Sequence, residues 1–525
     1  MRRAFDLIWP SVRPDLTWYA MALLAAPLSA GLTVVQPWLL RKALDEGVDS
    51  GDLDLLVWAS TGYLVGAVLS FVFEGGYNWV TAIGASRTVA RLRSRVFRHA
   101  LSLGASFYDR EPTGRLLSRV TSDVDALAET ITAGAVTLVL DLLLIAGLGG
   151  LLVWMDPWLS LVLLTVAPPL AVVLELIRRR MRVVFVAVRT HLAEMLAYAA
   201  ERITGVEVVQ LYAAEEASLR AFDARLGRYR DATVWTNVWD ALMFAVVDAT
   251  TAVTMAMMLA YGASERFGDA ATVGLLAAFV DGVGKLFGPI RELSNKVSVL
   301  QRAAAAVDKL GDLLDNQERV PDGTTDLPDE VGDVVFDDLT FGYVDGADVL
   351  KGVSFSIRPG EVVALVGRTG SGKSTVGKLL LRAYGGYRGR LHIDGTELSE
   401  VRHASLRSRI GVVQQDVVLF PDTVRFNLAM GEPIPDDRLW EALGRAQADD
   451  VVRRLGGLDA RIEHGGRNLS IGEGQLLAFA RVLCRDTPLV VLDEATASVD
   501  SLTERRIQDA THALLRERTV LVVAH

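Results

Sequence analysis

The chain has 525 residues, of which 51% are apolar and 22% are charged, so apolar and charged residues must be segregated into different regions. The net charge of −10 provides no overall basic surface, which argues against nucleic acid as a main partner. The single cysteine, Cys484, excludes an internal disulfide framework.

Apolar stretches dominate the first 300 residues. Each is about 20 residues long or more, which is the length a helix needs to cross a hydrocarbon core of roughly 30 Å. The six predicted spans are approximately 17–40, 55–84, 128–154, 157–177, 236–262 and 270–290. The N-terminal "MRRAFDL" suggests a twin-arginine export signal as an alternative, but no small-residue cleavage pattern ends the first stretch, which favours a retained helix.

Arginine residues set the predicted orientation of these spans. They precede the first span and fill the two long connections, 85–127 and 178–235, which are helical in pattern. By the positive-inside rule these segments are cytoplasmic, so both ends of the membrane domain are cytoplasmic as well. Helices that continue well beyond the bilayer are expected to meet a soluble domain there.

Four acidic residues interrupt the apolar stretches: Glu74, Asp141, Asp248 and Asp281. Charges at membrane depth are costly and normally face a cavity or a partner. They indicate either a polar translocation pathway that favours cationic cargo, or hydrogen bonds between helices, or positions nearer the membrane interface. The sequence leaves these alternatives open.

A change of composition marks the end of the membrane domain, which we place at 1–315. Residues 316–332 are polar and rich in Pro and Gly, as is typical of a linker. From 333 to 525 strand-like and helix-like stretches alternate, which predicts an α/β domain. Within it Cys484 lies in a helix-like stretch and is interpreted as a small buried hydrophobe, with a reactive thiol as the alternative.

The stretch "GRTGSGKST" matches the phosphate-binding loop (P-loop) pattern G-x-x-x-x-G-K-[ST]. It follows the strand-like "EVVALV" and precedes a helix-like stretch, which is the context that the pattern requires. Backbone N–H groups and the helix N-terminus bind the phosphates, while Lys373 is expected to reach the β- and γ-phosphates and Ser374 to bind Mg²⁺. The predicted nucleotide-binding residues are Gly367, Arg368, Thr369, Gly370, Ser371, Gly372, Lys373, Ser374 and Thr375.

A second acidic element follows at "PLVVLDEATASVD", residues 488–500. Four apolar residues predict a buried strand that ends in Asp493 and Glu494. Asp493 is expected to hold Mg²⁺, and Glu494 to polarise the water that attacks the γ-phosphate. The alternative is that the two acids only end the strand and have no catalytic role. The P-loop upstream argues against that alternative.

Over nearly its whole length the chain resembles the exporter-type half-transporters of the ATP-binding cassette (ABC) family. The stretches 107–127 and 201–216 are similar to the family's two cytoplasmic loops, whose short coupling helices rest on the nucleotide domains. The resemblance implies an all-α six-helix transmembrane domain with long cytoplasmic helix extensions, followed by an α/β P-loop ATPase domain. It also implies a multi-pass protein of the cytoplasmic membrane.

The same resemblance assigns further residues. Tyr343 matches the aromatic residue that stacks on adenine, and Gln415, in preference to its neighbour Gln414, matches the residue that touches Mg²⁺ and the attacking water. Asp500 falls in the loop that crosses between two nucleotide domains, and His525 matches the switch histidine that contacts the γ-phosphate. Because family members continue for several dozen residues beyond that histidine, the nucleotide domain is expected to be truncated at its C-terminus. That expectation leaves open whether this polypeptide itself hydrolyses ATP.

The family's signature, usually L-S-G-G-Q, reads Leu469 to Glu473 here. Ser470 and Gly472, which face the ATP of the partner chain, are kept, whereas Glu473 replaces Gln and brings a possible negative charge near that ATP. Either Glu473 points away, with Gln475 as a spare amide, or one of two composite sites is weakened. We therefore predict a heterodimer in which this chain supplies the hydrolysing P-loop and Glu494.

The function implied by the resemblance is ATP-driven export or flipping of a drug, lipid or other amphiphile by alternating access, with ATP and Mg²⁺ bound. The alternative is an ATP-gated channel or a regulatory subunit without net pumping. The retained Glu494 favours the pump, because a purely binding role does not require that carboxylate.

Overall fold

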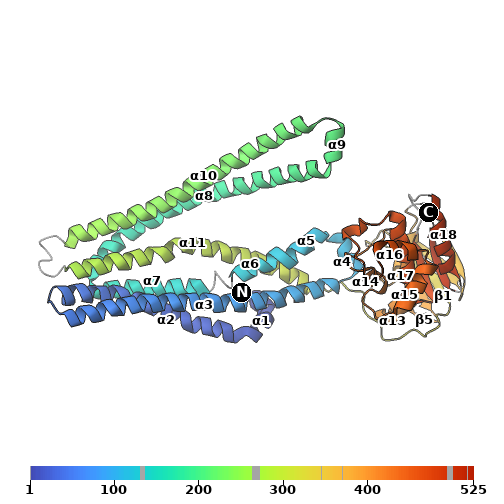
Figure 1. Cartoon of the computed structure of the whole chain (residues 1–525), viewed down its shortest axis with the longest axis horizontal. Helices are drawn as coiled ribbons and strands as arrows, with labels where there is room; N and C mark the ends of the chain where they lie inside the picture. The colour runs from blue at the N-terminus through green and yellow to red at the C-terminus, as the bar shows by residue number, and fades with distance from the viewer. Residues whose placement is uncertain are drawn as a thin grey trace. The chain divides into compact units, whose positions relative to one another are not determined.

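The computed structural model describes residues 2–130, 136–262, 272–344, 346–368, 370–493, 501–516 and 518–524. The chain forms two compact units (Figure 1). The first, the membrane unit, contains residues 1–98 and 117–315. The second, the nucleotide unit, contains residues 99–116 and 316–525. The predicted residues Thr369, Glu494, Asp500 and His525 lie outside the described residues.

The described part of the membrane unit is helical. Its α-helices are α1 (Arg2–Val12), α2 (Leu16–Lys42), α3 (Leu53–Leu101), α6 (Val124–Glu129), α7 (Val136–Met155), α8 (Pro157–Thr204), α9 (Val206–Leu211), α10 (Glu215–Gly262) and α11 (Val273–Asp315). Among the described residues, five helical segments are long and apolar enough to cross a membrane: 6–48, 53–101, 137–155, 157–204 and 215–258. The predicted sixth stretch, 270–290, begins outside the described residues and continues in α11.

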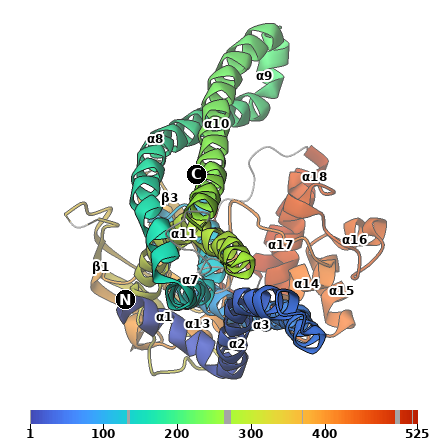
Figure 2. The same ribbon diagram turned by 90° about the vertical axis from the view of Figure 1, so that its left-hand side faces the viewer.

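Helix boundaries in this unit have local causes. A single residue, Asp156, separates α7 from α8, and its carboxylate accepts hydrogen bonds from the backbone N–H groups of Trp158 (2.8 Å) and Leu159 (2.9 Å). Pro157 follows at the first helical position, where its missing N–H costs nothing. The long helices α8 and α10 pack along each other and are joined by α9 (Figures 1 and 2).

Two of the four intramembrane acids bind other helices. Asp141 on α7 forms a buried ion pair with Lys296 on α11. Asp281 accepts hydrogen bonds from Lys285 Nζ (2.6 Å) and from Tyr63 Oη on α3 (3.3 Å). Lys285 Nζ also donates to Gln36 Oε1 on α2 (2.7 Å), so this cluster connects three helices. The other two acids, Glu74 and Asp248, lie exposed on the surface of the single chain.

The nucleotide unit contains two sheets. The first is antiparallel with strand order β2-β1-β4-β5, and the second is parallel with order β3-β8-β7-β6. The strands are β1 (Val334–Phe341), β2 (Leu350–Ile357), β3 (Val362–Val366), β4 (Arg388–Ile393), β5 (Thr396–Glu397), β6 (Ile410–Val413), β7 (Leu489–Asp493) and β8 (Thr519–Ala524). In β7 the first four residues are fully buried, as expected for a parallel strand covered on both faces.

Helices of the nucleotide unit pack against these sheets. They are α12 (Lys373–Leu380), α13 (His403–Arg409), α14 (Val424–Ala429), α15 (Asp436–Arg445), α16 (Asp449–Leu455), α17 (Ile471–Arg485) and α18 (Ser501–Leu515). One apolar core is formed by the five helices from α14 through α18 together with β7 and β8. A second core is formed by the antiparallel sheet and α12. The observed α/β architecture agrees with the alternation of strands and helices expected from 333 onward.

The first long connection contributes to the nucleotide unit. It contains α4 (Ala105–Arg110) and α5 (Thr113–Ser118), and the N–H of Gly104 donates to the carbonyl of Glu318 at 2.8 Å. Tyr384 Oη donates to the carboxylate of Asp109, and burial together with this bond raises the pKa of Tyr384. A short helix of the first connection therefore rests on the nucleotide unit, as the resemblance implies.

The buried Asp141–Lys296 pair leads to a stability prediction. Replacing Lys296 with Met is expected to destabilise the protein by about 3–5 kcal/mol, because Asp141 would remain buried without this partner. The double variant Asp141→Leu/Lys296→Met removes both charges and is expected to recover most of that loss. Thermal unfolding of the purified variants in detergent measures both effects; equal destabilisation of the single and double variants would contradict the interpretation.

Cys484 leads to a reactivity prediction. Its side chain is 2% exposed, and burial raises the pKa of the thiol to about 11. At pH 8 only about one thiol in a thousand would be ionised, and the thiolate is the nucleophile. We expect native protein to resist maleimide labelling at pH 8 and denatured protein to react at once. Rapid labelling of the native protein would restore the reactive-thiol alternative.

Candidate functional site

The described residues of the P-loop, Asp493 and the two predicted glutamines gather at one edge of the parallel sheet. β3 leads into the P-loop at Gly367, β7 ends at Asp493, and β6 is followed directly by Gln414 and Gln415. The register places Val413 beside Leu492 and Val366 beside Ala524, so these strands end level with one another. Carboxyl ends of parallel strands are where such folds bind ligands, so tertiary structure joins segments more than 100 residues apart.

Glycines shape the P-loop between β3 and α12. Gly370 and Gly372 have φ of +83° and +90°, a region that side chains other than glycine rarely adopt. A Cβ on Gly372 would also lie 2.7 Å from the side chain of Leu350. Helix α12 begins at Lys373 immediately after this turn, so its N-terminal N–H groups and partial positive charge face the loop.

Lys373 lies inside this loop. Its ammonium donates to the carbonyl oxygens of Gly367 (2.7 Å) and Arg368 (3.2 Å), and the residue is buried. The donors gathered here, a lysine ammonium and a helix N-terminus, suit an anion such as a nucleotide phosphate. Ser374 follows in the first turn of α12 and is partly exposed.

Tyr343 belongs to an aromatic group beside the P-loop. Its hydroxyl is 3.0 Å from Oγ1 of Thr375, and its ring meets Phe341 and Tyr384 edge-on at centroid distances of 5.2 and 5.1 Å. The ring is 42% exposed and borders a cavity of about 550 Å³ that also contacts Tyr384 and Asp109. Tyr343 is thereby connected to the first turn of α12 by a direct hydrogen bond.

The remaining predicted residues of this edge differ in their surroundings. Asp493 is partly buried at the end of β7, whereas Gln414 and Gln415 are both exposed after β6. Since both glutamines emerge at the same edge, the preference for Gln415 stays a prediction.

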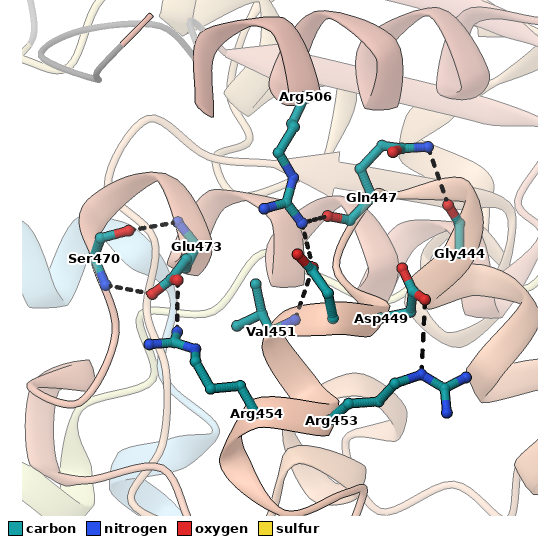
Figure 3. Close-up of polar contacts among 10 residues, drawn as sticks. Gly444, Gln447, Asp449, Val451, Arg453, Arg454, Ser470, Glu473 and Arg506 are labelled. Atoms are coloured by element: carbon teal, nitrogen blue, oxygen red, sulfur yellow. Dashed lines mark hydrogen bonds and ion pairs between the residues drawn. The ribbon is translucent and has the colours of Figure 1, made fainter. Parts of the chain in front are cut away.

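The signature residues lie at the start of α17, where Ser470 is the N-cap (Figure 3). Ser470 Oγ accepts from the N–H of Glu473 (3.2 Å), and Glu473 Oε2 accepts from the N–H of Ser470 (2.9 Å). This reciprocal arrangement is a capping box. Gly472 is buried in the first turn of α17, and Gln475, the predicted spare amide, is buried one turn further on.

A residue that the sequence interpretation missed completes this arrangement. Arg454, in the last turn of α16, donates through Nη2 to Glu473 Oε1 at 2.5 Å (Figure 3). The pattern S-x-x-E at 470–473 is itself a sequence signal for the capping box. No comparable signal points to Arg454, because 19 residues separate it from Glu473. Glu473 thus interacts with Arg454 rather than standing as an isolated charge.

Two family models match the chain. One is described as the ABC transporter transmembrane region and matches residues 19–290; the other is described as ABC transporter and matches residues 350–497. The two matches fall on the predicted membrane and nucleotide regions respectively.

Individual proteins are similar over nearly the full chain. The ATP-dependent lipid A-core flippase of Aliivibrio fischeri is 32% identical, over 99% of this chain and 90% of the relative. The flippase of the same name from Escherichia coli K12 is 31% identical, over 100% of this chain and 90% of the relative. Among solved structures, a bacterial Atm1-family ABC exporter with ATP bound has a TM-score of 0.74 at 26% identity, covering 97% of this chain and 91% of that one.

The contact between Tyr343 and Thr375 predicts how nucleotide affinity responds to substitution. Tyr343→Ala removes the ring and is expected to weaken nucleotide binding by about 1–3 kcal/mol, the usual contribution of a base stacked on an aromatic side chain. Tyr343→Phe removes only the hydrogen bond to Thr375 and is expected to bind at least as tightly as the wild type. Fluorescent nucleotide titration compares the two; equal losses would assign the effect to the hydroxyl.

Proposed function

The chain belongs to the ABC transporter family as an exporter-type half-transporter, and on this basis we propose that it moves a lipid or a similar amphiphile across the cytoplasmic membrane. It is an ATPase coupled to transport, and a multi-pass membrane protein with a cytoplasmic ATPase domain. The observation that carries the proposal is the gathering of the P-loop, Asp493 and the two glutamines at one sheet edge.

Each residue of that edge has a proposed task. Lys373 would exchange its contacts with the loop carbonyls for the β- and γ-phosphates of ATP, which are stronger acceptors. Ser374, Gln415 and Asp493 would hold Mg²⁺, which when bound neutralises charge on the phosphates. Their hydroxyl, amide and carboxylate oxygens are ligands that suit this ion.

Hydrolysis requires water to attack the γ-phosphorus in line with the bond to ADP. We assign Glu494 to orient and polarise that water, and His525 to contact the γ-phosphate. Tyr343 would stack on the adenine, with its exposed ring beside the P-loop. These assignments rest on the motif matches and on the place of the neighbouring residues at the sheet edge.

The partner of this chain is an ABC half-transporter. Ser470 and Gly472 would face the ATP held by the partner's P-loop, and Asp500 would lie in the crossing between the nucleotide domains. Apolar side chains around α9 support such pairing, because they are exposed in the single chain and would be covered by a second one. They are Ile203, Val206, Val208, Leu211 and Tyr212.

Whether the partner is a different chain stays a prediction. The heterodimer prediction assumes that Glu473 brings an uncompensated negative charge to the partner's ATP. Since Glu473 interacts with Ser470 and Arg454, its geometry gives that expectation no support. ATPase activity of the purified chain alone, compared with the chain mixed with a second half-transporter, distinguishes the two assemblies.

We propose a membrane domain of six spans over residues 1–315, with α11 as the sixth, a linker at 316–332 and the nucleotide domain from 333. An amphiphilic cargo is supported by the relatives, which are named as lipid A-core flippases. The polar cluster of Gln36, Tyr63, Asp281 and Lys285 would offer hydrogen bonds to a polar headgroup within the apolar unit.

Reconstituted transport tests this function. Wild-type protein in liposomes is expected to hydrolyse ATP and to move a fluorescent lipid between leaflets, while Lys373→Ala should abolish both activities. Glu494→Gln should bind ATP and lose at least about 100-fold in turnover, because the water would no longer be polarised. ATP-dependent ion conductance without lipid movement would instead establish the gated channel.

A further inference from the structure

Glu473, the acidic residue of the signature, interacts with Arg454 of α16. We propose that Arg454 is a positioning residue for ATP hydrolysis: it holds Glu473 in the capping box, so that Ser470 faces the partner's nucleotide without a repelling carboxylate beside it. The inference rests on the proposed function, in which the signature faces the phosphates of ATP bound by a second chain. It concerns a residue outside the P-loop, the acidic strand end and the signature itself.

The first step of the argument is that both oxygens of Glu473 are engaged. Oε2 accepts from the N–H of Ser470 at 2.9 Å, and Oε1 accepts from Arg454 Nη2 at 2.5 Å. The Glu473 side chain is only 20% exposed. The negative charge is thus compensated by a guanidinium and by the positive end of α17.

The second step concerns the hydroxyl of Ser470. A hydroxyl has one donor and two acceptor sites. Ser470 Oγ accepts from the N–H of Glu473, which leaves its own proton for donation. A capping box with this geometry therefore presents a hydroxyl donor at a helix N-terminus, which suits an anionic phosphate oxygen.

The third step is that Arg454 stands on an anchored helix. Arg506 of α18 donates to the carbonyl of Gln447 and to the carboxylate of Asp450, just before and at the start of α16 (Figure 3). Gly456, with φ of +109°, is the C-cap of α16, two residues after Arg454. Polar contacts thus link α18 through α16 to the first turn of α17.

Glutamine at 473 would not reproduce this arrangement. Its single carbonyl oxygen could serve the N–H of Ser470, but its NH₂ group would then face the guanidinium of Arg454, donor against donor. The substitution that restores the usual signature, Glu473→Gln, is therefore expected to slow this enzyme rather than to improve it. Removing Arg454 as well relieves the mismatch.

The test compares ATP hydrolysis by the full chain in lipid nanodiscs, with kcat and KM determined for each variant. We expect Arg454→Ala and Glu473→Gln each to lower kcat by about three- to tenfold, a charge effect near a helix terminus, and the double variant to be no slower than either single one. Arg454→Lys should recover most of the activity, and nucleotide affinity of the P-loop should not change. Arg453→Ala is the matched control, because Arg453 on the same helix pairs with Asp449 at 3.8 Å and lies over the ring of Trp440 on α15, away from the signature, and should behave as the wild type.

Amide hydrogen exchange of residues 468–476 provides a second measurement, which does not depend on ATP hydrolysis. Arg454→Ala should speed exchange there at least about threefold, and Arg453→Ala should not, because only the former releases the capping carboxylate. The inference is overturned if Glu473→Gln is faster than the wild type, if Arg454→Ala matches Arg453→Ala, or if exchange is unchanged. Failure of the proposed function differs, because the wild type itself would then show no ATP hydrolysis sensitive to Lys373→Ala.

Discussion

Parallel pairing of β3, β8, β7 and β6 is the constraint on which the nucleotide unit depends. β6, β7 and β8 are largely buried, so apolar packing fixes their register, and the more exposed β3 pairs with β8 at the edge of the sheet. The register decides which loops emerge together. The P-loop and Asp493 lie more than 100 residues apart in the chain, yet they reach the same edge because their strands end level. The nucleotide-binding site therefore depends on the packing that fixes how these strands pair.

Charge compensation is the second theme of the molecule. In the membrane unit, Asp141 with Lys296 and Asp281 with Lys285 are held between apolar helices, where an unpaired charge would be costly. In the nucleotide unit, Glu473 meets Arg454 at a helix start. In each case an acidic residue that looks anomalous in the sequence forms an ion pair with a basic residue, which lies on a neighbouring element or on the next turn of the same helix.

This compensation changes how the signature is interpreted. A sequence comparison with the usual signature presents Glu473 as a loss, because the amide is gone and a charge is added. In the structure the two carboxylate oxygens of Glu473 accept separate hydrogen bonds from Ser470 and Arg454. A glutamine amide has only one acceptor oxygen and could not accept both in this way. The altered signature is consistent with a site built for an acid, in a dimer of like or unlike chains.

The sequence by itself determined the order of the two regions, the apolar stretches, the P-loop at 367–375 and the acidic end of the strand at 488–493, because each is a local pattern of periodicity or spacing. It also contained the capping box, as S-x-x-E. Tertiary structure alone decided that Asp141 pairs with Lys296 and that Arg454 reaches Glu473. These contacts join residues that are distant along the chain, and no local preference encodes which surfaces pack together.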